Sequence, residues 1–210
     1  MFYPNLGQEN GDERDLENSY RSMLSPTALT VAQSYLSEEE SVFEYFLKNY
    51  TPIKKMNVCV VGGGVLPYLC KVLACAKKYI AIDPFMDLTT INNNHNNASK
   101  VEVISQSFQE YSLLRRENTN NVYFFWFNVA SYIPDLFSIL NMLLQKGDVI
   151  ILSGWGDTSA AKNVFKKYFE HLGEKDKEFL SLKSFPFKKL QPVYVEKVSG
   201  QYTDINIIYK

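Results

Sequence analysis

The sequence contains few of the residues that usually build metal centres and disulfide frameworks. Its 210 residues include only two histidines, His95 and His171, and three cysteines, Cys59, Cys70 and Cys75. All three cysteines occupy apolar positions of one predicted strand and the helix after it, which indicates reduced core thiols rather than disulfides or metal ligands. We expect His171 at the end of a helix, where its partial charge suits the helix dipole, and His95 in solvent.

The chain also lacks a charge excess of either sign and a long hydrophobic segment. Lysines plus arginines number 22 and aspartates plus glutamates 23, which gives a formal net charge of -1. Without a large positive field, binding of a nucleic-acid backbone is not expected. No window approaches about 18 unbroken apolar residues, and the N-terminus has no basic segment followed by an apolar run. We therefore expect a soluble, cytoplasmic protein without a membrane partner.

The segment from Asn57 to Pro84 predicts one βαβ unit, around which the rest of the chain is organised. Val58–Val61 is a short β-branched run, typical of a strand buried on both faces of a parallel sheet. Apolar residues between 66 and 74 recur at helical spacing, and Tyr79–Ile82 is a second apolar strand pattern.

Three consecutive glycines, Gly62, Gly63 and Gly64, follow the first of these strands. They leave no Cβ between strand and helix, so a ligand can approach the backbone amides and the positive end of the helix dipole. Asp83 follows the second strand, about 20 residues after the first glycine, where a carboxylate can bind both hydroxyls of a ribose. The combination, with Pro84 beside the acid, predicts a site for a nucleoside-bearing cofactor. A glycine turn alone would equally fit a structural turn.

Residues 1–54 are predicted to form a helical segment ahead of a cofactor-binding domain of residues 55–210. The sequence Ser25-Pro26-Thr27 is predicted to open one helix, and Ser37-Glu38-Glu39-Glu40 is predicted to be the capping box of a second. This pair of helices could close over the cofactor as a lid, or simply pack on the edge of the sheet.

After Asp83, strand and helix patterns alternate, and the chain ends in strand patterns alone. Strands are predicted at Val101–Ser105, Val122–Val129 and Val149–Leu152, helices at Phe108–Arg116, Pro134–Gln145 and Thr158–His171, and a loop at Ser153–Gly156. The final strand patterns are Phe179–Ser184, Val193–Val198 and Ile205–Tyr209, with a hairpin between the last two. These patterns predict an α/β fold, a doubly wound, mostly parallel sheet with an antiparallel C-terminal edge strand and N-terminal helices.

At the level of architecture, residues 55–210 resemble the class I S-adenosylmethionine-dependent methyltransferases. Val60-Val61-Gly62-Gly63-Gly64 looks like the glycine-rich first loop of that family, and Ile82-Asp83 looks like its ribose-binding acid. The resemblance implies S-adenosylmethionine as the cofactor, with the glycines beside its methionine part. It also implies that Gln106 and Ser107, after the third strand, lie near the adenine.

Phe127-Asn128-Val129 matches the position of the fourth-strand motif of this family, from which the acceptor is usually approached. For methyl transfer, positioning and desolvation of an in-line nucleophile can supply most of the catalysis. We expect Asn128 and Tyr132 in the catalytic centre, with Asn128 also near the cofactor, and we expect Ser131 and Trp155 to contact a small-molecule acceptor. Tyr132 could instead cap the next helix, and Trp155 could be packing.

Several departures from the family pattern keep other functions open. Leu66 replaces the third glycine of the usual loop, and no Asn-Pro-Pro-Tyr motif follows the fourth strand, so methylation of a base or a glutamine amide is not expected. The loop from Gly62 to Pro67 also looks like that of nicotianamine-synthase-like enzymes, which transfer the aminocarboxypropyl arm of the same cofactor.

Besides the methyltransferase and the aminocarboxypropyl transferase, a scaffold or binding protein of this fold is a third hypothesis. A nicotinamide dehydrogenase is disfavoured because no Tyr-x-x-x-Lys pair follows the fourth strand. The acceptor atom and the oligomeric state stay open.

Overall fold

The computed structural model describes residue 18 and residues 21–62, 71–85, 100–114, 119–174, 177–179 and 194–210, without the side chains of Leu114 and Tyr132. The predictions for Gly63, Gly64, Cys70 and His95 lie outside the described residues. The same holds for the start of the helix after the glycines and for most of the strand predicted at 179–184.

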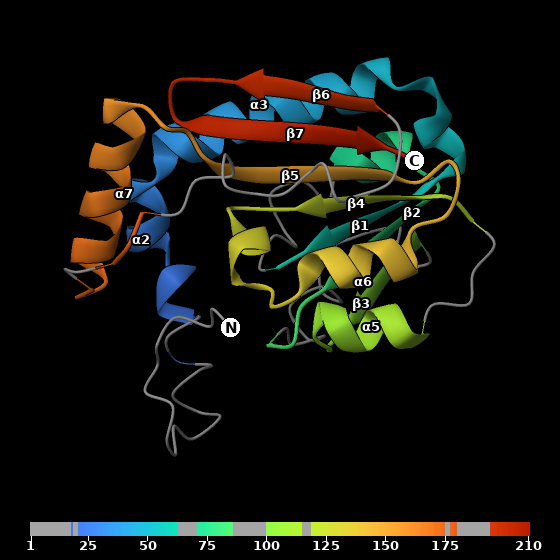
Figure 1. The fold of residues 1–210 in the computed structure, drawn as a ribbon, viewed down its shortest axis with the longest axis horizontal. Helices are drawn as coiled ribbons and strands as arrows, with labels where there is room; N and C mark the ends of the chain where they lie inside the picture. The colour runs from blue at the N-terminus through green and yellow to red at the C-terminus, as the bar shows by residue number, and fades with distance from the viewer. Residues whose placement is uncertain are drawn as a thin grey trace.

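The strands of the described residues form one seven-stranded sheet with the order β3-β2-β1-β4-β5-β7-β6 (Figure 1). Neighbours among β1 to β5 pair in parallel. β7 pairs antiparallel with both β5 and β6, so it alone runs against the other strands. The strands are β1 (Asn57–Val61), β2 (Lys78–Ile82), β3 (Val101–Ile104), β4 (Asn121–Phe125), β5 (Val149–Trp155), β6 (Tyr194–Ser199) and β7 (Thr203–Tyr209).

The predicted fold class is confirmed, with one refinement at the C-terminal edge. The reversed strand β7 lies one place inside the edge, and β6 lies outside it. From β1 the chain adds β2 and β3 on one side and then returns to add β4 and β5 on the other. The topological switch point therefore lies between β1 and β4, where α/β sheets bind their ligands at the carboxyl ends of the strands.

Helices cover both faces of the sheet (Figure 1). One buried cluster joins alternate strand residues to α2 (Pro26–Val31), α3 (Gln33–Asn49) and α7 (Ser159–His171). A second cluster joins the other strand residues to α5 (Phe108–Leu114) and α6 (Leu136–Leu143). Two short 3-10 helices, η1 (Thr51–Lys55) and η4 (Val129–Tyr132), follow α3 and β4, and residues 71–75 are helical, as predicted.

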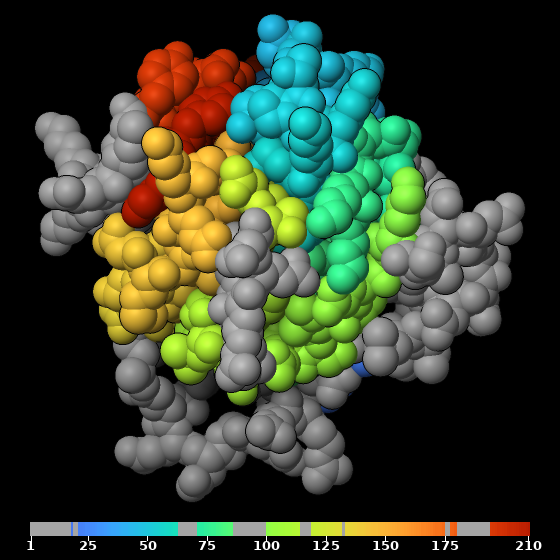
Figure 2. Space-filling model, turned by 90° about the vertical axis from the view of Figure 1, so that its right-hand side faces the viewer, coloured from blue at the N-terminus to red at the C-terminus, as the bar shows by residue number. Residues whose placement is uncertain are grey.

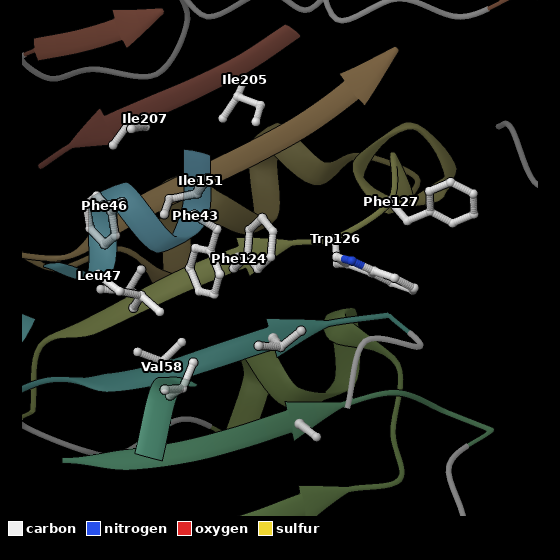
Figure 3. Close-up of a cluster of buried hydrophobic side chains, with 14 of the residues drawn as sticks. Phe43, Phe46, Leu47, Val58, Phe124, Trp126, Phe127, Ile151, Ile205 and Ile207 are labelled. Carbon is white, nitrogen blue, oxygen red and sulfur yellow. The ribbon is translucent and has the colours of Figure 1, made fainter. Parts of the chain in front are cut away.

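The N-terminal helix α3 shares its core with the sheet. The ring of Phe43 stacks on that of Phe124 in β4, with centroids 4.1 Å apart, and Figure 3 shows Phe46 and Leu47 on the same side of α3 above the strands. Burial of one such side chain contributes about 1.5–3 kcal/mol. α3 therefore packs on a face of the sheet, over the central strand β4, rather than on the edge that the packing alternative named, while closure over a cofactor stays a prediction.

The predicted capping box at Ser37 is wrong, because α3 runs without interruption from Gln33 to Asn49. The Ser37 hydroxyl accepts a hydrogen bond from Gln33 Nε2 within the helix. The three glutamates contact three other parts of the chain. Glu38 binds the turn between β6 and β7, Glu39 binds the segment after β4, and Glu40 pairs with Lys71.

Two predicted strand ends are also wrong. β4 ends at Phe125 rather than Val129, and β5 continues to Trp155, through the residues predicted to form a loop. After β4 the buried aromatic residues gave a strand signal, but burial does not distinguish the sheet from the helices that pack on it. In β5 the glycines at 154 and 156 gave a loop signal, although Gly154 lies within the strand. Figure 3 shows Trp126 and Phe127 beyond the end of β4.

The predicted C-terminal hairpin is confirmed, and it brings the end of the chain to the end of α3. The rings of Tyr50, at the end of α3, and Tyr209 lie 5.9 Å apart. Figure 2 shows this side of the molecule, with the segment around η1 (cyan) beside the C-terminal strands (red). α5, α6 and α7 lie where helices were predicted, and Thr158 caps α7 by accepting from Ala161 N at 3.0 Å.

Candidate functional site

Gly62 turns the chain out of β1 in a conformation that excludes other residues. Its φ is +81°, and a Cβ at this position would lie 2.6 Å from Cγ2 of Val129 in η4. Its amide donates to Ile82 O at 3.0 Å, which joins the turn to the end of β2. The group packed against this glycine within the described residues is the side chain of Val129 in η4, and the predicted approach of a ligand to the glycine backbone stays a prediction.

Asp83 lies at the carboxyl end of β2, as predicted, and its side chain is 1% exposed. Its amide donates to Ile104 O of β3 at 3.1 Å, and its Oδ1 accepts from Phe85 N at 2.9 Å. This Asx turn includes Pro84 and fixes the orientation of the carboxylate. Asp83 therefore lies next to the end of β1, which Gly62 follows.

The segment after β4 contains two consecutive non-glycine residues in the left-handed region, Phe127 (φ 48°) and Asn128 (φ 59°). Such residues cost about 1–3 kcal/mol each and concentrate at functional sites. Ser131 Oγ donates to Asn128 Oδ1 at 2.8 Å, so two predicted site residues are in direct contact. Tyr132 follows in the same 3-10 helix η4.

Glu39 supports this strained segment and was missed by sequence analysis. Its side chain is 0% exposed, and its Oε1 accepts from the amide of Phe127 at 2.8 Å. A hydrogen bond to a charged group contributes about 1.5–3 kcal/mol, enough to offset much of the strain. One signal was present in the sequence: Glu39 lies four residues after Tyr35 and four before Phe43, in the middle of a buried stripe.

Ser107 follows β3 but is engaged in a helix cap. Its amide and its hydroxyl both donate to Glu110 Oε2, at 2.8 and 2.7 Å, and Glu110 N donates back to Ser107 Oγ at 3.2 Å. These hydrogen bonds from Ser107 lower the pKa of the Glu110 carboxyl. The spacing Ser107-Phe108-Gln109-Glu110 is the capping-box signal, which sequence analysis missed. Gln106 lies half-buried at the bend between β3 and this cap.

Trp155 lies inside the core rather than in a loop. It is 2% exposed, and its ring centroid is 4.4 Å from that of Tyr35 and 5.5 Å from that of Phe165. These contacts place it on the α3 and α7 face of the sheet, and they fit the packing alternative. Asp157, after β5, forms an ion pair of 2.6 Å with Lys162.

The structure thus brings some of the predicted residues together and separates others. Gly62, Asn128 and Ser131 meet at the switch point through Val129, and Asp83 lies one strand away. Ser107 is a further strand away, after β3, and Trp155 faces the other helix layer.

Within the described ranges, no group of three or more His, Cys, Asp or Glu residues could hold a metal ion. None of the described helices is long and apolar enough to span a bilayer.

Comparison with known proteins identifies the fold. No family model matches the chain, and no curated protein matches it. Among solved structures, magnesium protoporphyrin IX methyltransferase from Synechocystis PCC 6803, crystallised with S-adenosylmethionine, matches with a TM-score of 0.54 at 11% identity, over 90% of this chain and 88% of that chain. A protein assigned as an S-adenosylmethionine-dependent methyltransferase from Methanococcus maripaludis matches with a TM-score of 0.54 at 13% identity, over 96% of both chains.

An O-methyltransferase family protein from Burkholderia thailandensis matches with a TM-score of 0.56 at 13% identity, over 93% of this chain and 59% of that chain. Together with the strand order, these matches show that the chain has the Rossmann-like fold of the class I S-adenosylmethionine-dependent methyltransferases. They give no support to the nicotianamine-synthase-like alternative.

Proposed function

We propose that the protein is an S-adenosylmethionine-dependent methyltransferase that acts on a small molecule. The observation that carries the proposal is the conjunction at the switch point. A glycine turn in the left-handed region follows β1, a buried carboxylate follows β2, and a strained segment with hydrogen-bonding side chains follows β4. Ligands of doubly wound sheets bind where such neighbouring strands end.

The residues present fit the proposed cofactor. The buried carboxylate of Asp83, whose Oδ1 accepts from Phe85 N, is of the type that accepts hydrogen bonds from ribose hydroxyls. At Gly62 the space of the missing side chain is filled by Val129, so the glycine brings η4 against the end of β1. The cofactor would supply an electrophilic methyl group on a positively charged sulfur. The protein would then need only to orient the acceptor and exclude water.

Asn128 and Ser131 are the residues proposed to orient the acceptor. The Asn128 amide group is held by Ser131, and its backbone is held by the turn that Glu39 supports. Its side chain therefore has a fixed position at the carboxyl end of β4, which is what an orienting group requires. Tyr132, three positions before Asp135 at the start of α6, is proposed to contact the nucleophile.

Calorimetry with four ligands tests this function on the wild-type protein. S-adenosylmethionine and S-adenosylhomocysteine are expected to bind, and methylthioadenosine and NAD are expected to bind at least ten-fold more weakly. Preferential binding of NAD would contradict the proposal. Binding of none of the four would favour a scaffold protein that keeps the fold.

Replacement of Asp83 provides the matching test of the site. We expect Asp83→Asn to weaken S-adenosylhomocysteine binding by at least ten-fold, because the amide is a poorer acceptor for two hydroxyls. The melting temperature should change little, since the amide oxygen can still accept from Phe85 N. Asp157→Asn, which removes a charge on the surface after β5, is the control and should leave binding within two-fold. Equal loss of binding and stability in Asp83→Asn would make Asp83 a structural residue.

A further inference from the structure

Asp204 is a buried acid that the proposed function does not yet use. It lies in β7 and is 9% exposed, and its Oδ2 is buried without a hydrogen-bond partner. Among the described residues, no ion pair or side-chain hydrogen bond to Asp204 is formed. The other buried acids differ, because Asp83, Asp148 and Glu39 each accept from a backbone amide.

The position of Asp204 along β7 places it at the edge of the sheet that carries the candidate site. Its Cα is in register with Gly154, the residue before the last in β5, and with Ser199, the last residue of β6. β5 is parallel to β1 and β4, so Gly154 is close to the carboxyl ends of these strands. Adjacent strands are about 4.8 Å apart, so Asp204 lies about 10 Å across the sheet from β4, within the span of a small ligand.

Asp204 also faces the same side of the sheet as the segment that carries Asn128 and Ser131. Side chains alternate along a strand. Ile205 and Ile207 belong to the buried cluster on the α3 side of the sheet, and Ile208 belongs to the cluster on the α6 side. Asp204 therefore faces the α6 side.

The short helix η4 lies against β5. Its Ala130 belongs to the cluster on the α6 side, and its Val129 packs against that cluster. Asp204 and η4 therefore flank the carboxyl end of β5, where Gly154 contributes no side chain.

A nearly buried carboxylate without a partner is unfavourable for the fold, because it loses solvation and gains no compensating interaction. Unsatisfied buried groups in native proteins call for an explanation such as a catalytic role or a bound species. A cation is the complement of such a group, and an ammonium or guanidinium group supplies both the charge and the N–H donors. Since no set of metal ligands surrounds Asp204 in the described part of the chain, an organic cation fits better than a metal ion.

We propose that Asp204 binds the cationic group of the acceptor, so that the substrate is a small molecule bearing an ammonium or guanidinium group. This inference rests on the proposed methyltransferase function and narrows its substrate class. Asp204 anchors the cation over β5, and the nucleophilic atom of the acceptor, a separate uncharged group, lies toward Asn128. Asp204 is thus a specificity residue and takes no proton during transfer.

The test uses matched compounds that share a skeleton and differ in charge. The probes are tyramine, 4-ethylphenol and 4-hydroxyphenylacetate, then tryptamine, 3-ethylindole and indole-3-acetate, then 5-aminopentan-1-ol, pentan-1-ol and 5-hydroxypentanoate. Binding is measured by calorimetry in saturating S-adenosylhomocysteine, and transfer is measured with radiolabelled S-adenosylmethionine. The proteins are wild type, Asp204→Asn, and the control Glu196→Gln, which changes an acid of β6 that lines a groove against α3 on the other face.

We expect the cationic members of at least one set to bind wild type at least ten-fold more tightly than the neutral and anionic members. Asp204→Asn should lose this preference while it keeps S-adenosylhomocysteine affinity within two-fold and an equal or higher melting temperature. Glu196→Gln should keep the preference. Absence of a charge preference in wild type, retention of it in Asp204→Asn, or unfolding of that variant would each overturn the inference. Failure of wild type to bind S-adenosylhomocysteine would instead overturn the proposed function.

Discussion

At the scale of single residues, Gly62 is the position where backbone conformation and packing both exclude a side chain. The left-handed φ of +81° disfavours any L-residue, and Val129 fills the space that a Cβ would occupy. Gly173 offers a natural comparison, because its φ of +83° is almost the same but no atom lies within 4 Å of its ideal Cβ. A comparison of alanine substitutions at Gly173 and Gly62 therefore separates two contributions to the loss of stability. Gly173 reports the cost of the left-handed backbone alone, and Gly62 adds the cost of the steric collision with Val129.

We expect Gly173→Ala to lower the free energy of unfolding by about 1 kcal/mol, the cost of the left-handed conformation alone. Gly62→Ala should cost about 2–4 kcal/mol, because overpacking against Val129 adds about 1–3 kcal/mol. Urea denaturation measures both. The double variant Gly62→Ala with Val129→Ala should relieve the closest part of this collision, because it removes Cγ1 and Cγ2 of Val129 and leaves only its Cβ, 3.0 Å from the added Cβ. If the two single variants were equally stable, η4 would not be held against the glycine turn.

The residues of the site were predictable only as far as they depend on the local sequence. Gly62 and Asp83 could be found because a glycine turn and an acid after neighbouring strands form a short-range pattern. Glu39 could not be assigned, because its partner Phe127 lies 88 positions away. Ser107 caps α5 through a local pattern that sequence analysis missed, and its predicted place near the adenine stays a prediction.

At the scale of elements, α3 is joined to the C-terminal hairpin by a single carboxylate. The Glu38 side chain accepts from the amides of Gln201, Tyr202 and Thr203, each at 2.7 Å, and from the Thr203 hydroxyl at 2.9 Å. A Cβ at Gly200 would lie 2.2 Å from Glu38 Cδ. The turn between β6 and β7 is thus shaped as an anion-binding concavity around this side chain.

We expect Glu38→Ala to lower the free energy of unfolding by about 2–4 kcal/mol, because it leaves several donors of the turn without their charged acceptor. Glu40→Ala, two residues along the same helix, is the control. Its ion pair with Lys71 is partly exposed, and such pairs contribute about 0–1 kcal/mol. Chemical denaturation compares the two variants, and hydrogen exchange should show faster exchange of β6 and β7 amides only in Glu38→Ala. A similar loss in both variants would contradict this role of Glu38.

The elements that were predicted correctly have a hydrophobic period of their own. α6 buries Leu136, Ile139, Leu140 and Leu143 at helical spacing, and the buried strands β1 and β2 are short apolar runs between polar residues. The end of β4 was mispredicted because Trp126 and Phe127 are buried by packing beyond the strand, and the end of β5 because glycines flank Trp155. Aromatic burial supplied by a distant helix has no signature in the adjoining sequence.

At the scale of the whole molecule, the end of α3 and the C-terminal strand β7 meet at Tyr50 and Tyr209. Burial, followed by the nearby charge of Glu196, raises the pKa of Tyr209 from 10.0 to about 12. The unfolded chain releases this phenolic proton at a lower pH than the folded chain does. The resulting contribution to stability is therefore complete below pH 10 and is lost as the pH rises from 10 to 12.

Denaturation of wild type between pH 9 and pH 12 should show this loss of stability. Tyr209→Phe should decline less steeply over the same interval, because phenylalanine has no proton to release. The comparison of slopes, rather than of absolute stability, isolates the phenol from the packing of its ring. Identical slopes in the two proteins would show that Tyr209 titrates normally in the folded chain.

The contact between Glu38 and the hairpin turn has a consequence for biosynthesis. Its donors lie 163 to 165 positions after the glutamate, so the interaction can form only after the chain through Thr203 has left the ribosome. Until then the Glu38 side chain of α3 lacks the backbone amides that it binds in the folded protein, and α3 is not yet held in its final position over the strands. Folding should therefore include a step, late relative to the synthesis of α3, in which β6 and β7 complete the described sheet and fix α3 in place.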